Sequence, residues 1–203
     1  MYVRTLLIAV ILLRAVSTRT ISWTECPVVN PSFPSINMFQ QPDNGISFCG
    51  VQSLPYNYSN SNNVTLRHKL FLSPSPKGNV ILIGDSIIGN SGEGIEQIGF
   101  FLYKSLSNAY NVYIPGLRGT NDEALSMCSG QTGLSLDRLG TINCQNDPLY
   151  GDYDGLTVDM IASDVIEFIN QVTLKYPDIP FTYYGRGFGS YIVNRILTMN
   201  KTN

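Results

Sequence analysis

Histidine, charge and long apolar runs are all scarce in this chain of 203 residues. Charged residues make up 14% of it and the formal net charge is -2, which leaves no basic patch of the kind that binds nucleic acid. The chain has one histidine, and its four cysteines include no C-x-x-C pair, so the common zinc sites are excluded. We expect no metal, no other cofactor and no nucleic-acid partner. The 43% of hydrophobic residues suits a single globular domain.

The apolar run near the N-terminus, Leu6 to Leu13, is too short to cross a bilayer. It follows Arg4 and precedes Ala15-Val16-Ser17, whose small residues are typical of a signal-peptidase site. These features predict a signal peptide over residues 1–17. The mature protein would be secreted or lie in the endomembrane lumen, without a stable membrane span. An uncleaved membrane anchor is the alternative.

The cysteines are consistent with an oxidising compartment, where disulfides persist. They are Cys26, Cys49, Cys128 and Cys144. Four cysteines allow three pairings, and their spacing does not choose among them. Pairing of sequence neighbours is the simplest, and each closed loop would then stabilise the fold by roughly 3 kcal/mol. Disulfides are favoured over free thiols at Cys128 and Cys144.

Three N-x-S/T sequons predict glycosylation of a secreted protein, at Asn57, Asn63 and Asn200. The triplet that begins at Asn30 is excluded because Pro31 follows it. Such triplets also arise by chance in a chain rich in Asn and Ser, so each site stays a prediction.

Predicted strands and helices alternate through the second half of the chain. Strands are expected at 64–72, 79–83, 111–114 and 181–184, and helices at about 95–107, 157–176 and 191–199. The last three strands read as short buried runs. This alternation predicts an α/β fold, a mostly parallel sheet with flanking helices. Ligands of such sheets bind beyond the carboxyl ends of the strands.

A nucleophile-elbow frame, G-x-S-x-G, occurs at the end of the last predicted strand. It reads Gly185-Arg186-Gly187-Phe188-Gly189, with glycine at the serine position. An elbow is a sharp turn from strand to helix that exposes one side chain above the sheet. Gly187 provides the turn but offers no oxygen for attack on a substrate. The segment therefore indicates a hydrolase scaffold and argues against hydrolase chemistry.

Other interpretations of the same segment are weaker. Ser190 is the nearest hydroxyl and a weak candidate nucleophile, since a serine needs an adjacent base to activate it. The stretch from Gly185 to Ser190 also approaches the dinucleotide fingerprint G-x-G-x-x-G/A. Ser190 replaces its last small residue, and no ribose-binding acid follows at the required distance.

The remaining candidate side chains are better explained as structural. His68 precedes the elbow, in the wrong order for a triad. Asp85 follows a buried strand and could line a pocket, but a turn residue is the commoner explanation. Asp164 is expected to face water from its helix. Arg186 stands beside the vacated tip and could hold a carboxylate, although a solvated arginine is favoured.

Four features of the mature chain resemble the secreted tripeptidyl- and prolyl-aminopeptidase-like branch of the α/β-hydrolase serine peptidases. They are Trp23 and Cys26 with Cys49; Leu54-Pro55-Tyr56-Asn57-Tyr58 followed by Val64-Thr65-Leu66; Tyr113 to Thr120, similar to D-x-R-G-T-G; and Tyr184 to Tyr191 with Arg195 downstream, similar to Y-G-x-S-Y-G-T-Y. The resemblance covers most of residues 23–197. After the signal peptide at 1–17, we therefore expect an N-terminal arm at 18–63 and a partial, truncated α/β-hydrolase-like domain at 64–203.

The departures from this family fall on its catalytic machinery. Gly187 replaces the serine, and Gly116 replaces the aspartate of D-x-R-G-T-G. The oxyanion-like positions Gly84, Asp85 and Phe188 belong to altered loops. The triad's Asp and His would follow the elbow, and we expect neither before Asn203.

The favoured hypothesis is a secreted, non-catalytic family member or fragment that binds peptides or another protein. The alternative is an active secreted serine hydrolase or peptidase whose longer form supplies the missing triad members. A third possibility is a truncated product that does not fold alone.

Overall fold

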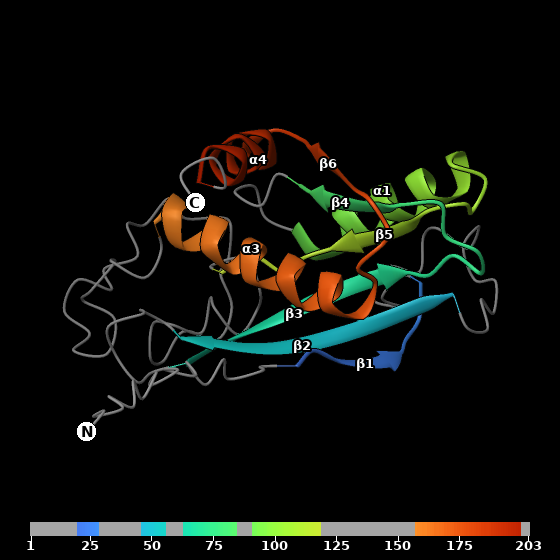
Figure 1. Ribbon diagram of the computed structural model, residues 1–203, viewed down its shortest axis with the longest axis horizontal. Helices are drawn as coiled ribbons and strands as arrows, with labels where there is room; N and C mark the ends of the chain where they lie inside the picture. Colours follow the sequence, from blue (N-terminus) through green and yellow to red (C-terminus); the bar gives the residue numbers. More distant parts are fainter. Residues whose placement is uncertain (1–19, 29–45, 56–62, 85–90, 119–156, 200–203) are drawn as a thin grey trace, which may run out of the picture.

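The computed structural model describes residues 20–28, 46–55, 63–84, 91–118 and 157–199 (Figure 1). The elements follow in the order β1 (Ser22–Glu25), β2 (Ser47–Pro55), β3 (Asn63–Phe71), β4 (Asn79–Ile83), α1 (Ser91–Ser105), β5 (Asn111–Ile114), α3 (Val158–Lys175), β6 (Phe181–Gly185) and α4 (Phe188–Met199). Helices and strands alternate from β4 onward, and the helices flank one sheet. The predicted α/β fold class is therefore confirmed.

The strands form one six-stranded sheet in the order β1-β2-β3-β5-β4-β6. β4 lies between β5 and β6 and pairs with both in parallel. The pairings β1–β2, β2–β3 and β3–β5 are antiparallel. The sheet is thus mixed, whereas a mostly parallel sheet was predicted. Its parallel part is confined to β4, β5 and β6, because parallel strands need crossover connections such as those that contain α1 and α3.

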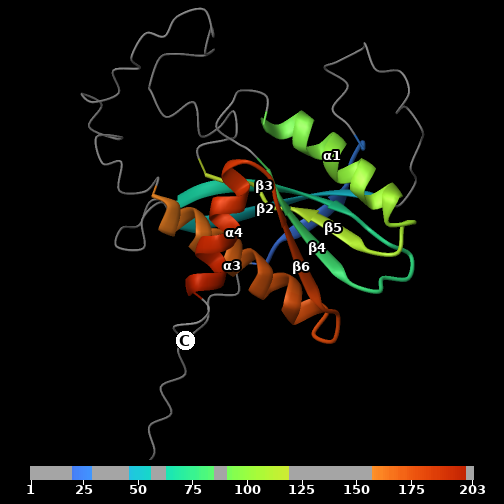
Figure 2. The same ribbon diagram turned by 90° about the horizontal axis from the view of Figure 1, so that it is seen from above.

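Helices cover both faces of the sheet (Figure 2). Successive side chains of a strand point to opposite faces, so β4 contributes to two cores. Its residues Val80 and Leu82 pack in the cluster that contains Phe100 and Tyr103 of α1. Its residues Ile81 and Ile83 pack in the cluster of α3 and α4. A continuous apolar run is therefore the right sequence for this strand.

The boundaries of α3 follow from local chemistry. Thr157 caps the N-terminus, where its hydroxyl accepts a hydrogen bond from the Met160 N–H at 3.2 Å. Tyr176 caps the C-terminus, and Pro177 comes directly after it. The helix predicted for residues 157–176 is confirmed.

The N-terminal segment contributes more than the predicted arm at 18–63, because β1 and β2 lie within it and extend the sheet. The ring of Trp23 lies over Gly50, where an added Cβ would come within 2.8 Å of it. A disulfide joins Cys26 to Cys49 and confirms that predicted pair. These strands were not predicted because β2 contains Gly50 and Pro55, which are unfavourable in strands, and because β1 is short.

The prediction that the last strand is buried is wrong for one of its faces. Phe181, Tyr183 and Gly185 of β6 are half-buried, whereas Thr182 and Tyr184 are exposed. α1 packs on β3 and β5, so it leaves this face of β6 uncovered by the described residues.

Several predicted features lie outside the described residues: the signal peptide at 1–17, Asn57, Asp85, Cys128, Cys144 and Asn200. The remaining sequon residue, Asn63, is exposed at the start of β3. Within the described segments, no helix combines the length and the apolar character that a membrane crossing needs.

Candidate functional site

The nucleophile-elbow frame forms a tight turn between β6 and α4. The Arg186 N–H donates a hydrogen bond to the Ile83 carbonyl at 3.0 Å, and the Gly189 N–H donates to the Arg186 carbonyl at 2.9 Å. The tip is thereby fixed at the carboxyl end of β4. Gly187 occupies the tip with φ 56°, in the left-handed region. Glycine adopts this conformation without the cost that a side chain would bring.

The last glycine of the frame is required by close packing. A Cβ at Gly189 would stand 2.0 Å from the Ile83 carbonyl oxygen, so only glycine lets α4 begin this close to β4. The frame is therefore the steric solution to a strand–turn–helix connection above the sheet. Glycine also stands at the tip of this turn, at Gly187.

Ser190 lies in the first turn of α4 and is exposed. Its N–H donates to the Gly187 carbonyl at 3.0 Å. Among the described residues, no carboxylate or imidazole is hydrogen-bonded to its hydroxyl. The described part of the chain therefore supplies no base to activate this hydroxyl.

The structure describes some of the other predicted site residues, and these differ in exposure. Arg186 is exposed beside the tip, and Phe188, which begins α4, is half-buried. Gly84 is buried directly after β4, and it is the only part of the predicted oxyanion-like loop after β4 that the structure describes. The structure therefore places Gly84, Arg186 and Phe188 at the ends of neighbouring strands and does not place Asp85.

The segment that follows β5 is hydrogen-bonded to β3 at the end of the sheet where the elbow turn lies. The Gly116 N–H donates to Nδ1 of His68 at 3.0 Å. A Cβ at Gly116 would meet the Arg67 carbonyl oxygen at 2.1 Å. An aspartate, which the D-x-R-G-T-G motif has at this position, would not fit this backbone.

His68 is a buried structural residue. Its ring lies 4.6 Å from that of Phe168 in α3, centroid to centroid. Burial lowers the pKa of its imidazole to about 3. Because Nδ1 accepts a hydrogen bond, the neutral ring carries its proton on Nε2.

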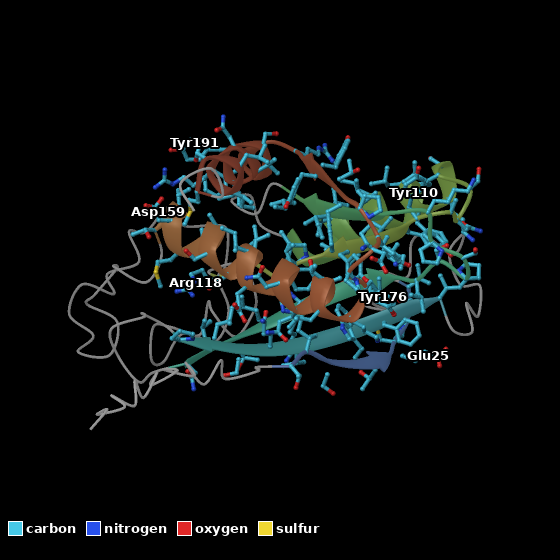
Figure 3. All side chains as sticks on the ribbon, viewed as in Figure 1. Glu25, Tyr110, Arg118, Asp159, Tyr176 and Tyr191 are labelled. Carbon is cyan, nitrogen blue, oxygen red and sulfur yellow. A yellow bond between two sulfur atoms is a disulfide. The ribbon has the colours of Figure 1, made fainter. Side chains whose placement is uncertain are left out.

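The prediction that Asp164 faces water is wrong. Its carboxylate accepts two hydrogen bonds from Arg118, each at 2.6 Å, and both side chains are 1% exposed. The Arg118 Nη2 also donates to the Pro55 carbonyl at 3.2 Å. Figure 3 shows Arg118 beside the first half of α3. This ion pair joins α3, the segment after β5 and the end of β2.

Burial raises the pKa of the Asp164 carboxyl, and the hydrogen bonds and charge of Arg118 oppose that rise. The sequence carried a signal for this burial. Asp164 follows Ile161 by three residues and precedes Phe168 by four, so it lies on the apolar stripe of α3. A carboxylate on such a stripe needs a cationic partner, and the partner lies far away in sequence.

A second ion pair joins α3 and α4 at the surface. Nε and Nη2 of Arg195 donate to the Asp159 carboxylate at 2.6 and 2.8 Å. Both side chains are substantially exposed. The hydrogen bond from Arg195 lowers the pKa of Asp159, and the same bond raises that of Arg195. This pair fixes the first turn of α3 against α4.

Comparison with known proteins finds solved structures that are similar at low sequence identity. No protein-family model matches the chain, and no curated protein matches it in sequence. The chain resembles a zinc-bound, cold-adapted esterase from an Arctic intertidal metagenomic library, at 13% identity and a TM-score of 0.47, over 89% of this chain and 60% of that one. It also resembles lipase A of Candida antarctica, at 12% identity and a TM-score of 0.44, over 88% of this chain and 37% of that one.

A thermostable carboxyl esterase from Bacillus coagulans is similar at 14% identity and a TM-score of 0.43, over 73% of this chain and 39% of that one. The chain spans less than two thirds of the length of these proteins. Among the described residues, no cluster of histidine, cysteine and carboxylate side chains could hold a metal ion.

Proposed function

We propose that this protein is a secreted, non-catalytic relative of the α/β-hydrolase serine peptidases, of the aminopeptidase-like branch that its motifs resemble. The observation that carries the proposal is the elbow itself. The segment forms a tight strand–turn–helix connection that is fixed by backbone hydrogen bonds, but the residue at its tip is Gly187. Acyl transfer by a serine hydrolase needs a nucleophilic oxygen at that tip.

The outer edge of β6 suits an extended peptide as its ligand. The Pro180 carbonyl accepts from the Asn79 N–H, and the Arg186 N–H donates to the Ile83 carbonyl, both toward β4. Backbone groups of a strand alternate in direction, so those of Phe181, Tyr183 and Gly185 point to the outer edge of β6. No described strand pairs with that edge. A peptide can add there as a further strand.

Arg186 gives this edge a charge preference. It is exposed and immediately follows β6, next to the empty tip. A guanidinium binds a carboxylate with two parallel hydrogen bonds. A peptide running along β6 with its C-terminal carboxylate near Arg186 would use both features.

A fluorophosphonate probe tests the absence of catalysis. We expect the purified wild-type protein to show no labelling above that of a heat-denatured sample, and the same result for Ser190→Ala. Labelling of the wild type that disappears in Ser190→Ala would instead establish the alternative, an active serine hydrolase with a relocated nucleophile.

Fluorescence polarisation with a library of labelled extended pentapeptides tests the binding. Peptides with a free C-terminal carboxylate should bind more tightly than their amidated forms, by about tenfold or more. Arg186→Gln should remove this difference, whereas Lys175→Gln, at the end of α3, should preserve it. Equal affinity for both peptide forms, or no binding at all, would contradict the proposal.

A further inference from the structure

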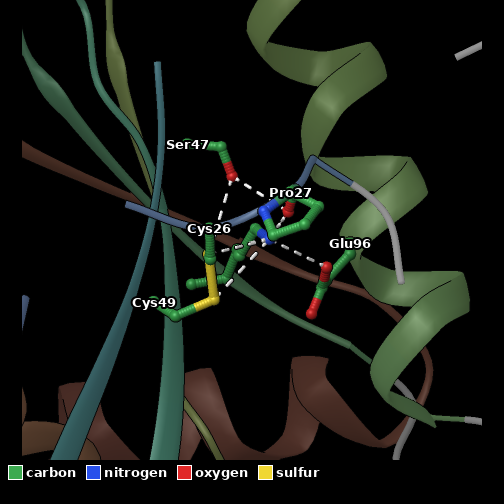
Figure 4. A network of polar contacts seen from close by, with 6 residues as sticks. Cys26, Pro27, Ser47, Cys49 and Glu96 are labelled. Atoms are coloured by element: carbon green, nitrogen blue, oxygen red, sulfur yellow. Dashed lines mark hydrogen bonds and ion pairs between the residues drawn. A yellow bond between two sulfur atoms is a disulfide. The ribbon is translucent and has the colours of Figure 1, made fainter. Parts of the chain in front are cut away.

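The Cys26–Cys49 disulfide belongs to a network of polar contacts with Pro27, Ser47 and Glu96 (Figure 4). A buried lysine, Lys69, lies against the disulfide. Lys69 Nζ lies 3.3 Å from Sγ of Cys26 and 3.8 Å from Sγ of Cys49. It also donates to the Pro27 carbonyl and forms an ion pair with Glu96 of α1 at 3.2 Å. The Lys69 side chain is only 5% exposed. The ammonium group is therefore held at the sulfur atoms from several directions.

Pairing in the sheet fixes this arrangement. Lys69 of β3 is the register partner of Cys49 of β2, and both side chains lie on the face that α1 covers. Burial lowers the pKa of Lys69, and the charge and hydrogen bond of Glu96 oppose that effect. The fold therefore buries the Lys69 ammonium group beside a disulfide, although an intact disulfide carries no charge.

An ammonium group beside sulfur has its main chemical effect when the sulfur is a thiolate. A neighbouring lysine lowers the pKa of a thiol, and a thiol of lower pKa leaves faster in thiol–disulfide exchange. Cys26 is closer to Nζ than Cys49 is, so its thiolate is the better stabilised of the two. Both cysteines are partly exposed, which gives an external thiol access to the bond.

We propose that the Cys26–Cys49 bond is a thiol–disulfide exchange site for a dithiol reductant, with Cys26 as the leaving group and Lys69 as its stabilising cation. A thiolate of the dithiol attacks Sγ of Cys49, the Sγ–Sγ bond breaks, and its electron pair leaves on Cys26. The second thiolate of the reductant then attacks the reductant sulfur of the mixed disulfide. Cys49 is released and takes up a proton, and the reductant becomes a cyclic disulfide, so two electrons pass to the cysteine pair.

The charged groups that face the bond from the packed elements are Lys69 of β3 and Glu96 of α1. Glu25 precedes Cys26 by one residue, so alternation along β1 places it on the opposite face. Ser47 of β2 adds a hydroxyl 3.9 Å from Sγ of Cys26. Lys69 is therefore the only described cation at the sulfur atoms.

Reduction of the folded protein by dithiothreitol tests the role of Lys69. Samples are quenched by alkylation, and peptide mass spectrometry measures Cys26 and Cys49 separately from the other cysteines. Lys69→Met should slow reduction at pH 7 by about tenfold. Lys69→Arg should stay close to the wild type, and so should Lys77→Met, which removes an exposed lysine elsewhere. A variant that was merely destabilised would be reduced faster, so an unchanged or increased rate in Lys69→Met overturns the proposal.

Two measurements on the wild type test the mechanism without any variant. Incubation with the monothiol glutathione should give a mixed disulfide at Cys49 and a free thiol at Cys26, and the reverse distribution overturns the proposal. In the reduced protein, alkylation of Cys26 should show a thiol pKa below the ordinary value of about 8.5. A pKa at or above that value overturns the assignment of Cys26 as the stabilised thiolate.

Discussion

At the scale of single residues, the ionisable groups buried on the α3 side of the sheet avoid an unpaired buried charge in two ways. Arg118 and Asp164 keep their charges and neutralise each other. His68 avoids a charge, because it is held as the neutral imidazole. Removing a charge from water is costly, so each arrangement has a measurable consequence for stability.

Replacing Asp164 by Asn should remove the carboxylate that accepts two hydrogen bonds from the buried Arg118 guanidinium. Arginine cannot lose its proton to relieve this, so we expect a loss of about 3–5 kcal/mol in the free energy of unfolding. Urea denaturation at pH 7 measures it. Arg118→Met should cost less, since the Asp164 carboxyl can take up a proton instead.

The surface pair of Asp159 and Arg195 provides the matched control. It has a similar two-bond geometry but is exposed to solvent, where water screens the interaction. Asp159→Asn should leave the urea midpoint nearly unchanged. Equal losses at Asp159 and Asp164 would show that burial does not set the strength of these pairs.

His68 should make stability depend on pH between about pH 6.5 and pH 3. The folded protein keeps this imidazole neutral down to a pKa of about 3. The unfolded chain takes up the proton near pH 6.5, so acid favours unfolding and stability falls as the pH is lowered through this range. The slope approaches about 1.4 kcal/mol per pH unit.

Urea midpoints at pH 7.0, 6.0 and 5.0 measure this dependence. The chain contains a single histidine, so His68→Asn should flatten the profile above pH 5, while its amide oxygen can still accept from the Gly116 N–H. An unchanged profile in the variant would mean that His68 is not held neutral.

At the scale of elements, local sequence predicted what local interactions determine. The helix at 157–176 was predictable because its apolar stripe and its N-terminal Thr157 cap are contained in one segment. The strands 79–83 and 111–114 were predictable as short apolar runs. The turn at Gly187 was predictable because the glycine frame Gly185-x-Gly187-x-Gly189 is contained in five consecutive residues.

Features that depend on distant partners could not be predicted in the same way. β1 and β2 are stabilised by their pairing and by the Cys26–Cys49 bond, not by strong strand propensity. Asp164 is satisfied by Arg118, and Lys69 by Glu96, across long separations. The exposed face of β6 depends on where α1 packs, which the sequence of β6 does not contain.

Two glycines at helix N-termini should respond oppositely to alanine. A Cβ at Gly94 in α1 meets nothing within 4 Å, so Gly94→Ala should stabilise the protein by about 0.5–1 kcal/mol through helix propensity. Gly189→Ala in α4 should destabilise it by about 3 kcal/mol or more, because the Cβ would overlap the Ile83 carbonyl. Thermal unfolding of both variants checks the difference. Similar effects at the two positions would contradict the close approach of α4 to β4.

At the scale of the whole molecule, the two ends of the sheet that the described residues form are protected to different degrees. β1 at one end is short and is tied to β2 by a disulfide that begins just after it. β6 at the other end has the sequence Phe-Thr-Tyr-Tyr-Gly, without charge or proline, and Tyr184 is 47% exposed. An uncharged edge strand of this kind is a template for pairing with another chain.

The concentration dependence of the sedimentation coefficient should therefore respond to a charge on β6. Tyr184→Lys should lower self-association and light scattering, because a lysine on an edge strand opposes edge-to-edge pairing. Leu174→Lys is the matched control, since Leu174 is 72% exposed but lies on α3 and not on a strand. If Leu174→Lys reduced association as much as Tyr184→Lys, general surface hydrophobicity would be the cause. An effect confined to Tyr184 identifies the β6 edge as the surface at which this molecule meets other chains.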